Sequence, residues 1–338
     1  MQDSSTSSAL LKTLKAITIH SATSYTIAGG QTQSLEEEPN KSVNENSQLI
    51  TSLTNSLYAR CYITPFSLAH NKNQSYDLED PFFTTRLSKA NQGRDRWDNN
   101  WQIYEITKEG RILAQKGECS RSALPGTYQV AQGKPKKGDS VSLAVSTNEN
   151  SLTKGFYYMN GETLSDQFDE YDLLRFYFNI KAEGAAPLVE YLSRELNLRH
   201  TPFSFKCLNN LSNYNRLDSA VLYIAKRYYR VVISILTELP KEITKNLNPQ
   251  TSLFTKPLLP GISLAEDPGN GESFGMHRCK IVAQGVVKTW KNGSQSPKDR
   301  LETINDIFTQ KGLSLEHSYL KAGSTDIFTL PHSTGVIL

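Results

Sequence analysis

Three short segments set the architecture of this chain: Arg-Phe-Tyr-Phe-Asn (175–179), Pro-Phe-Ser-Phe-Lys-Cys (202–207) and Tyr-Asn-Arg-Leu-Asp-Ser-Ala-Val-Leu-Tyr (214–223). Each combines apolar residues with a cationic or phenolic side chain, and each is predicted to be a strand. Apolar residues at helical spacing predict a helix over 186–198, between the first two segments. A strand, a helix and a strand in this order predict an α+β core, in which helices pack on a mainly antiparallel sheet.

The second segment places a lysine where it can do chemistry. Alternation along a strand puts Phe203 and Phe205 on one face, and Ser204 and Lys206 on the other. A lysine held in a cleft loses hydration, which lowers its pKa and makes the neutral amine available as a general base. The alternative is that Lys206 lies on the solvated face of an ordinary strand, and alternation alone does not separate the two interpretations.

Composition excludes several classes of protein. The chain has 338 residues and a formal net charge of +3, with neither an arginine-rich run nor an aromatic ladder for nucleic acid. Its longest apolar runs, such as 231–236, are too short to span a bilayer, so no membrane association is expected. The four cysteines lie far apart without a Cys-x-x-Cys pair, and no compact His/Cys or carboxylate cluster suggests a metal. These features, with no signal peptide at the N-terminus, predict a cytoplasmic protein without a cofactor.

The first half of the chain predicts a β-rich module with short helices. Leu10, Leu11, Leu14, Ile17 and Ile19 have helical spacing, and a second helix is expected over 47–61. Short strands between turns follow. They include a hairpin of 101–106 with 111–116 and a strand at 140–145.

The second half ends in a loop and two helices. Proline and glycine are dense between 254 and 271, which predicts a loop. A helix is expected after Glu272-Ser273-Phe274, and a last one over 297–310. Four parts are therefore expected. They are an N-terminal tail with helices (1–55), a β-rich module (56–166), an α+β catalytic core (167–330) and a C-terminal tail (331–338).

Ordered motifs over about residues 80–328 resemble one family. They are Trp97-Asp…Trp101, Gly155-Phe156-Tyr157, Arg175-x-Tyr177-x-Asn179, Glu183-Gly-Ala185, Leu196-Asn197, Pro202-Phe-x-Phe-Lys206, Tyr214-x-Arg216-x-Asp218, Val221-Leu-Tyr223, Phe254-Thr-Lys256-Pro257 and Glu266-Asp-Pro-Gly-x-Gly-Glu-Ser-Phe-Gly-x-His-Arg-Cys279. The order resembles the HopA-type effector family. Free-standing bacterial members of that family act in the modification of ribosomally made peptides, notably class V lanthipeptides and thioamide-containing relatives.

The resemblance implies a phosphoserine/phosphothreonine lyase. Such a lyase removes phosphate from a peptide side chain that a separate Ser/Thr kinase has phosphorylated, and it leaves dehydroalanine or dehydrobutyrine. The implied partners are therefore a phosphorylated precursor peptide and a kinase-like protein. The phosphothreonine lyase effectors of the OspF and SpvC kind are distant relatives that share this chemistry.

The resemblance also implies residue roles. Lys206 corresponds to the catalytic lysine, Arg216 to the phosphate-binding arginine, and Tyr223 to the end of the following strand. The histidine acid of the distant relatives has no counterpart on the 175–179 strand, so Tyr177, Tyr223 and His277 remain candidates for the general acid. A phosphate with nearly two negative charges calls for arginine and lysine. The residues expected around it are Arg175, Arg216, Lys256 and Arg278, with 254–279 as the opposite wall.

Two further interpretations stay open. The missing histidine favours a peptide-binding or scaffold protein that recruits the peptide or the kinase without catalysis. A serine-rich N-terminus also resembles the secretion signal of an effector, although such signals are unspecific. Arg216 in Tyr-x-Arg-x-Asp has an alternative role as well, as a structural ion pair with Asp218.

Overall fold

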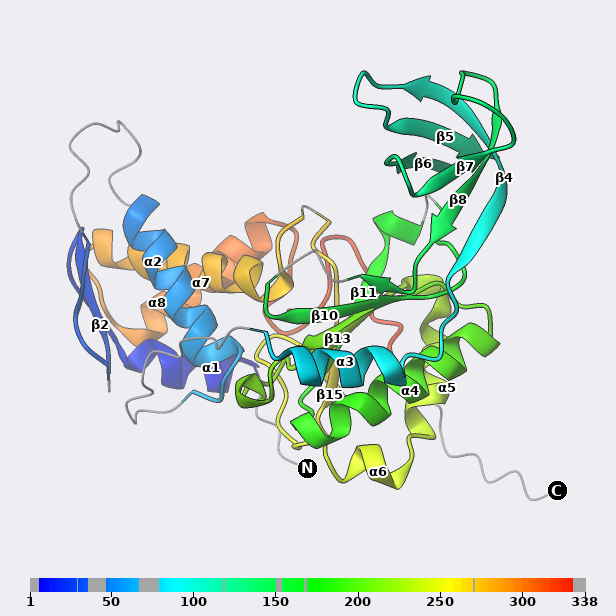
Figure 1. The fold of residues 1–338 in the computed structure, drawn as a ribbon. Coiled ribbons are helices and arrows are strands. Elements are labelled where there is room, and N and C mark those ends of the chain that lie inside the picture. Colours follow the sequence, from blue (N-terminus) through cyan, green and yellow to red (C-terminus); the bar gives the residue numbers. More distant parts are fainter. Residues whose placement is uncertain are drawn as a thin grey trace.

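The structure is a computed structural model that describes residues 6–28, 30–35, 47–66, 79–117, 119–149, 154–166, 169–269 and 271–330. The expected C-terminal tail, 331–338, and the first five residues of the expected N-terminal tail lie outside these ranges. Figure 1 shows three parts: a helical lobe built from both ends of the chain, a central sheet, and a separate small sheet.

The helical lobe joins segments that are far apart in the sequence. Its helices are α1 (Thr6–Lys15), α2 (Ser47–Leu57), α7 (Phe274–Lys291) and α8 (Pro297–Gln310). A small antiparallel sheet lies at its end, with β1 (Ile17–Ser21), β2 (Ser24–Ile27) and β3 (Gln33–Ser34). The buried guanidinium of Arg300 fastens the two ends of the chain, because its Nη1 donates to the carbonyls of Leu14 (2.9 Å) and Ile17 (2.7 Å).

The expected helix over residues 10–19 is wrong in its second half. The helix ends at Lys15, and Ile17 and Ile19 lie in β1, where both side chains are buried. Two isoleucines two residues apart satisfy strand alternation as well as helical spacing, and β-branched residues favour a strand.

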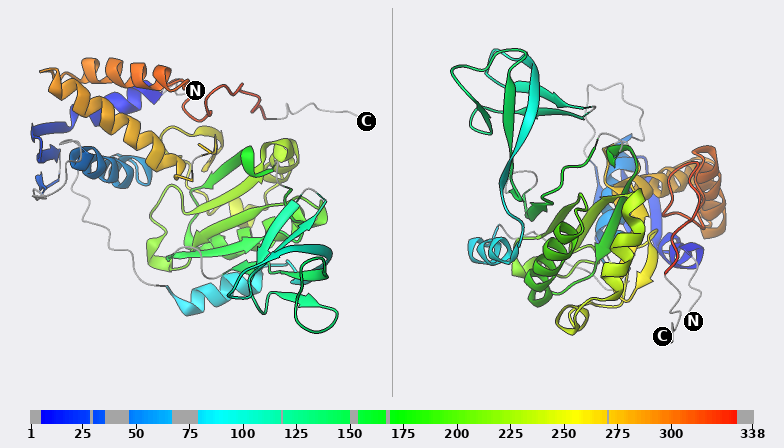
Figure 2. Two further views of the ribbon diagram at one scale, coloured as in Figure 1. Left: turned by 90° about the horizontal axis from the view of Figure 1, so that it is seen from above. Right: turned by 90° about the vertical axis from the view of Figure 1, so that its right-hand side faces the viewer.

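The five-stranded sheet is a separate antiparallel unit with its own small core around Trp101 and Ile103. Its strand order is β6-β5-β4-β8-β7. The strands are β4 (Arg96–Ile106), β5 (Ile112–Lys116), β6 (Cys119–Ala123), β7 (Tyr128–Val130) and β8 (Ser140–Val145). The expected hairpin is confirmed, because β4 pairs with β5. Figure 2 shows the sheet standing apart from the helical lobe.

The central sheet is antiparallel throughout, in the order β14-β15-β11-β13-β12-β10-β9. The strands are β9 (Asn148–Glu149), β10 (Phe156–Asn160), β11 (Leu173–Phe178), β12 (Ser204–Leu208), β13 (Ala220–Ala225), β14 (Lys256–Leu259) and β15 (Ile262–Glu266). The α+β class with a mainly antiparallel sheet is confirmed. The sheet also takes in β9 and β10, which precede the expected boundary at residue 166. The expected strand over 214–223 begins only at Ala220, because the residues before it form a loop.

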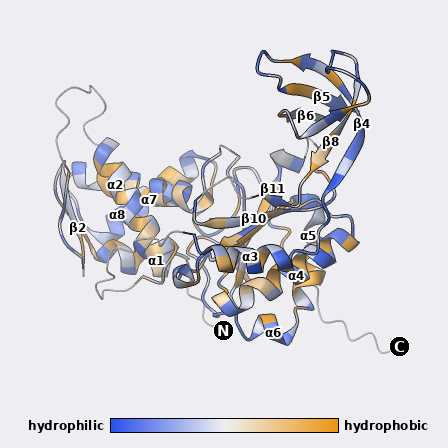
Figure 3. Cartoon of the chain, viewed as in Figure 1, coloured by the Kyte–Doolittle hydropathy of each residue, from blue (hydrophilic) through white to orange (hydrophobic). Residues whose placement is uncertain are grey.

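Helices cover one face of the central sheet. They are α3 (Pro81–Ala90), α4 (Ala182–Leu198), α5 (Tyr229–Thr237) and α6 (Lys241–Thr244). Short helical turns lie elsewhere in the chain: η1 (Tyr58–Tyr62), η2 (Asp169–Tyr171), η3 (Leu211–Asn213) and η4 (Lys226–Tyr228). Phe176 of β11 stacks on Tyr229 of α5, with ring centroids 6.3 Å apart. Hydrophobic and hydrophilic residues alternate along these helices in Figure 3, as amphipathic packing requires.

Within the described residues, no helix has both the length and the apolar character needed to cross a membrane. All four cysteines are free.

Candidate functional site

The second face of the central sheet gathers the polar side chains, and the strand register explains how. Lys206 lies opposite Val221 of β13 and Tyr158 of β10, and Arg175 lies opposite Tyr223. Paired residues in an antiparallel sheet point to the same side, so these side chains share the face away from Phe176 and α5. The helical lobe covers one part of this face, through Tyr177 against Tyr62 and Phe274.

Lys206 is partly buried and forms no ion pair with the residues that the structure describes. Its Nζ lies 4.7 Å from the ring centroid of Phe156 and 5.7 Å from that of Tyr223. In the part of the chain that the structure describes, this Nζ makes no hydrogen bond and no ion pair. Burial lowers the pKa of Lys206 and outweighs the opposing effects of Tyr158 and Asp218, while the positive charges of Arg175 and Arg216 lower the pKa further. Lys206 is therefore partly buried beside two aromatic rings and is not a fully exposed residue of the strand.

Arg175 reaches the same face from the neighbouring strand. Its Nε donates to Asp267 (2.7 Å), and its Nη2 donates to the carbonyl of Glu272 (3.0 Å) as well as pairing with Asp267. Its guanidinium carbon lies 5.5 Å from the ring centroid of Tyr223. Among the described residues, Nη1 of Arg175 has no hydrogen-bond partner, so one donor remains free for a ligand.

Arg216 is close to Lys206 but is already engaged. Its Nε and Nη2 hold both carboxylate oxygens of Asp218, at 2.7 and 2.9 Å, and Nη2 also donates to the hydroxyl of Tyr58 (3.2 Å). The guanidinium lies 5.9 Å from the ring of Phe156, the ring that Lys206 also contacts. The ion pair with Asp218, the alternative interpretation from the sequence, is therefore present. The pair places both a positive and a negative charge near Lys206, and Asp218 raises the pKa of Lys206 more than Arg216 lowers it.

Two of the three candidates for the general acid lie on this face. Tyr223 is half-buried between Arg175 and Lys206, and burial raises its pKa, which keeps its hydroxyl protonated at neutral pH. Burial also raises the pKa of Tyr177, but the Tyr177 side chain is only 4% exposed beneath the helical lobe. Tyr223 is thus the better placed of the two to meet a ligand.

The loop expected to form the opposite wall does not bring its cations to Lys206. Lys256 lies opposite Leu264, which lies opposite Phe176, so its side chain is on the helix-covered face of the sheet. Its Nζ pairs with Asp326 at 2.5 Å and lies over Tyr319. The loop expected over 254–271 is wrong at β14 and β15, which are strands of the central sheet. The face that Lys256 takes follows from the register of β14 on β15, which proline and glycine density does not reveal.

His277 and Arg278 lie at the start of α7 and belong to the helical lobe. The Arg278 side chain is buried, and its Nε and Nη2 donate to the carbonyls of Ser318 and Leu320, both at 2.8 Å. Its Nη1 lies 2.5 Å from Nδ1 of His277. Burial, reinforced by Arg278, lowers the pKa of His277 to about 4. None of these contacts reaches Lys206 or Tyr223. The structure therefore separates His277 and Arg278 from Lys206 and the residues around it, Arg175, Arg216 and Tyr223, which form the Lys206 cluster.

Sequence reasoning missed the residues that surround Lys206 from β10 and η1. Phe156 supplies the ring under Lys206, Tyr158 lies directly opposite it, and Tyr58 holds Arg216. The Gly155-Phe-Tyr motif marked this strand, and alternation from Phe156 would have selected Tyr158 as well. No local signal marks Tyr58, which is 158 residues away from Arg216.

Comparison with curated proteins gave no match. Two solved structures that resemble the chain are effector proteins from Pseudomonas syringae. The one from pathovar tomato strain DC3000 is 13% identical with a TM-score of 0.44, and the match covers 82% of this chain and 100% of the other. The one from pathovar syringae strain 61 is also 13% identical, with a TM-score of 0.41, over 81% of this chain and 96% of the other.

A family comparison is decisive for classification. The sequence model of the HopA1 effector protein family matches residues 147–320, which is more than half of the 338-residue chain. The match contains the whole central sheet from β9 to β15 and omits the five-stranded sheet. It is shorter than the expected 80–328, and the Trp97…Trp101 motif lies outside it. The chain belongs to the HopA1 effector protein family.

Proposed function

We propose that this protein is a phosphoserine/phosphothreonine lyase that acts on a peptide phosphorylated by a separate kinase. The observation that supports the proposal most is the state of Lys206. This side chain forms no ion pair with any described residue, and its burial near two arginines and a tyrosine lowers its pKa, which favours the neutral amine. A structural lysine in such a position would instead be expected to have a carboxylate partner.

The proposed reaction is a β-elimination that needs no water and no redox partner. The neutral Nζ of Lys206 takes the Cα proton, and the electron pair of that C–H bond forms the Cα=Cβ double bond. The Cβ–O bond breaks, and phosphate leaves with its electron pair. The product peptide contains dehydroalanine from phosphoserine or dehydrobutyrine from phosphothreonine.

Tyr223 is the proposed proton donor to the leaving phosphate. It shares the face with Lys206, and its hydroxyl carries a proton at neutral pH. The charge of Arg175, which opposes the effect of burial on the pKa of Tyr223, makes donation of that proton easier. Arg175 is the proposed phosphate ligand, because its Nη1 has no hydrogen-bond partner among the described residues and the side chain lines the neighbouring cavity. Burial is proposed to be the main cause of the lowered pKa of Lys206, because the charge of Arg216 lowers it less than the charge of its partner Asp218 raises it.

The second candidate is a peptide-binding or scaffold protein without lyase activity. One observation favours it: both arginines near Lys206 are already bound to carboxylates, Asp267 and Asp218. A phosphate entering the site would have to approach these acids, which repel it. In this role the protein would bind the precursor peptide or recruit the kinase without changing the phosphorylated residue.

Mass spectrometry separates the two candidates. A phosphoserine or phosphothreonine peptide is incubated with the protein, and the product is checked for loss of phosphoric acid. The lyase proposal expects this loss from wild type and none from Lys206→Ala, which should still bind the peptide. Lys298→Ala is the matched control, because Lys298 is exposed on α8. Elimination by Lys206→Ala would show that another group is the base, and binding without any elimination by wild type would support the scaffold role.

The pH dependence tests the role of Lys206 in a second way. Only the neutral amine accepts a proton, so kcat/KM should rise with pH and level off above the pKa of Lys206. Because burial and the arginines lower that pKa, the rise should be centred below the 10.5 of an unperturbed lysine. A rate that falls as pH rises through this range would contradict Lys206 as the base.

A further inference from the structure

A cavity of about 760 Å³ lies between the five-stranded sheet and the central sheet, beside the Lys206 cluster. Its size is within the range of about 300–1,000 Å³ that is typical of ligand sites. Arg175, Tyr223 and Ser204 form its wall on the central sheet, and Ser204 is two residues from Lys206 on the same face. The cavity is therefore continuous with the proposed catalytic face, although Lys206 itself is not among its lining residues.

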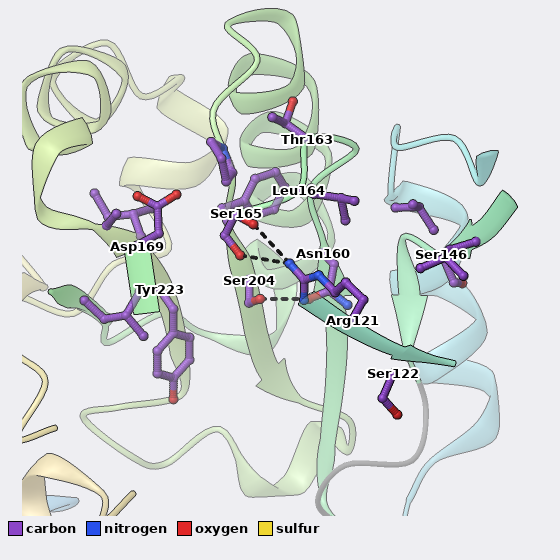
Figure 4. A pocket seen from close by; sticks show the side chains of 18 of the residues that line it. Arg121, Ser122, Ser146, Asn160, Thr163, Leu164, Ser165, Asp169, Ser204 and Tyr223 are labelled. Carbon is purple, nitrogen blue, oxygen red and sulfur yellow. Dashed lines mark hydrogen bonds between the residues drawn. The ribbon is translucent and has the colours of Figure 1, made fainter. Parts of the chain in front are cut away.

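Most of the charged side chains that line the cavity form ion pairs. Asp267 is paired with Arg175, and Asp169 is paired with Arg227. Arg121 of β6 is the exception, because its Nη2 donates only to the carbonyl and hydroxyl of Ser165, at 3.1 and 3.3 Å. Figure 4 shows its guanidinium reaching across the cavity toward Ser165. Within the described residues, this cation on the cavity wall has no anionic partner.

The rest of the lining suits an extended peptide more than an apolar ligand. Neutral polar side chains of both sheets and of the 160–165 segment face the space: Ser122, Thr127, Ser146, Asn160, Thr163 and Ser204. Short hydroxyl and amide groups can hydrogen-bond a peptide backbone without demanding a particular side chain. A strong preference for one class of side chain would then come from the single uncompensated charge, Arg121.

We propose that this cavity holds the segment of the substrate peptide that flanks the phosphorylated residue, and that Arg121 binds a second anionic side chain of that segment. The inference rests on the proposed function, because it takes a phosphopeptide as the ligand. The anion is a carboxylate from aspartate or glutamate, or the phosphate of a second phosphorylated residue. The five-stranded sheet thus contributes specificity, while the central sheet contributes the chemistry.

Binding of synthetic peptides tests this site without relying on turnover. The probe is a fluorescent peptide of neutral polar residues with one phosphonate analogue of phosphoserine, which has no leaving oxygen. A single glutamate is moved through each neighbouring position, and affinity for wild-type protein is measured by fluorescence anisotropy. One position, or two adjacent ones, should raise affinity about five- to tenfold over glutamine, as a charge-assisted hydrogen bond does. Replacing that glutamate by phosphoserine shows whether carboxylate or phosphate is the preferred anion.

Variants of Arg121 decide whether this residue is responsible. Arg121→Gln should remove the preference for glutamate, and Arg121→Glu should reverse it in favour of a lysine at the same position. Arg121→Lys keeps the charge and should retain part of the preference, which guards against misfolding of the neutral variant. Arg111→Gln is the control, because Arg111 is an exposed arginine immediately before β5 that does not line the cavity.

The outcomes for the inference and for the lyase proposal are separate. Affinity that is independent of glutamate position, or a preference that survives Arg121→Gln, overturns the inference even if wild type eliminates phosphate. A preference that depends on Arg121, in a protein that eliminates nothing, supports the anion site and contradicts the lyase instead.

Discussion

Lys206 and Arg278 both lie beside an aromatic ring, but they differ in their hydrogen bonding. Lys206 lies 4.7 Å from the ring of Phe156, and Arg278 lies 4.8 Å from the ring of Phe274. Arg278 gives its donors to two backbone carbonyls and meets His277, whereas Lys206 has no hydrogen-bond partner among the described residues. A cation whose donors all have hydrogen-bond partners stabilises the fold, whereas an amine without such partners remains able to bind or accept a proton. The difference shows why position beside an aromatic ring does not by itself indicate catalysis.

For the proposed lyase activity, the largest expected effect is loss of elimination in Lys206→Met. Methionine fills the same space without an amine, so the rate should fall by about 10²- to 10⁴-fold, as for loss of a general base. Thermal unfolding should show equal or higher stability, because an unpaired cation beside two arginines is removed. A large fall in the melting temperature would mean that Lys206 stabilises the fold, and the contrast with Arg278 would not hold.

Arg278→Met should show the reverse pattern. The carbonyls of Ser318 and Leu320 lose their donors in a buried site, so unfolding should become easier by roughly 3 kcal/mol. Urea denaturation measures this change. Elimination per folded molecule should remain close to wild type at a temperature where the variant is folded, and a selective loss of activity would place Arg278 at the phosphate after all.

His277 makes the stability of the helical lobe depend on pH. Its pKa is about 4 in the folded protein, below the ordinary 6.5, so the unfolded chain binds a proton more readily between these values. Wild type should therefore lose stability as pH falls from 6.5 toward 4, by about 2 kcal/mol or less because the ring is partly accessible. His277→Gln lacks this proton uptake, so the difference in unfolding free energy between the two proteins should shrink or change sign over this range. A constant difference would contradict a half-buried imidazole that stays neutral in the folded protein.

Lys256→Ala should have the smallest effect. The ion pair with Asp326 is partly exposed, with side chains 23% and 29% accessible, so its loss should cost about 1 kcal/mol or less. Because Lys256 points to the opposite face from Lys206, the elimination rate should not change. A rate decrease would show that the 254–259 segment approaches the substrate.

Local signals in the sequence were sufficient for regular elements with clear ends. The helix expected over 297–310 matches α8, because Ser296 caps it and Pro297 suits its first position. Alternation likewise gave the correct facing of Lys206 and Phe205 in β12. The prediction of a strand from Tyr214 is wrong before Ala220. Arg216 and Asp218 lie in a loop and pair with each other, which alternation along the sequence does not reveal.

The sequence by itself determined the α+β class, the family and the strand that holds Lys206, since these depend on periodicity and on ordered motifs. Tertiary structure alone decided which cations meet. The register of β14 on β15 places Lys256 on the opposite face of the sheet from Lys206. Arg278 donates to backbone carbonyls of the helical lobe. The pairing of β10 with β12 places Phe156 and Tyr158 beside Lys206. The cavity with Arg121 required two separate sheets to face each other. Such contacts join residues far apart in the chain, and no local pattern encodes which face or which partner each side chain will find.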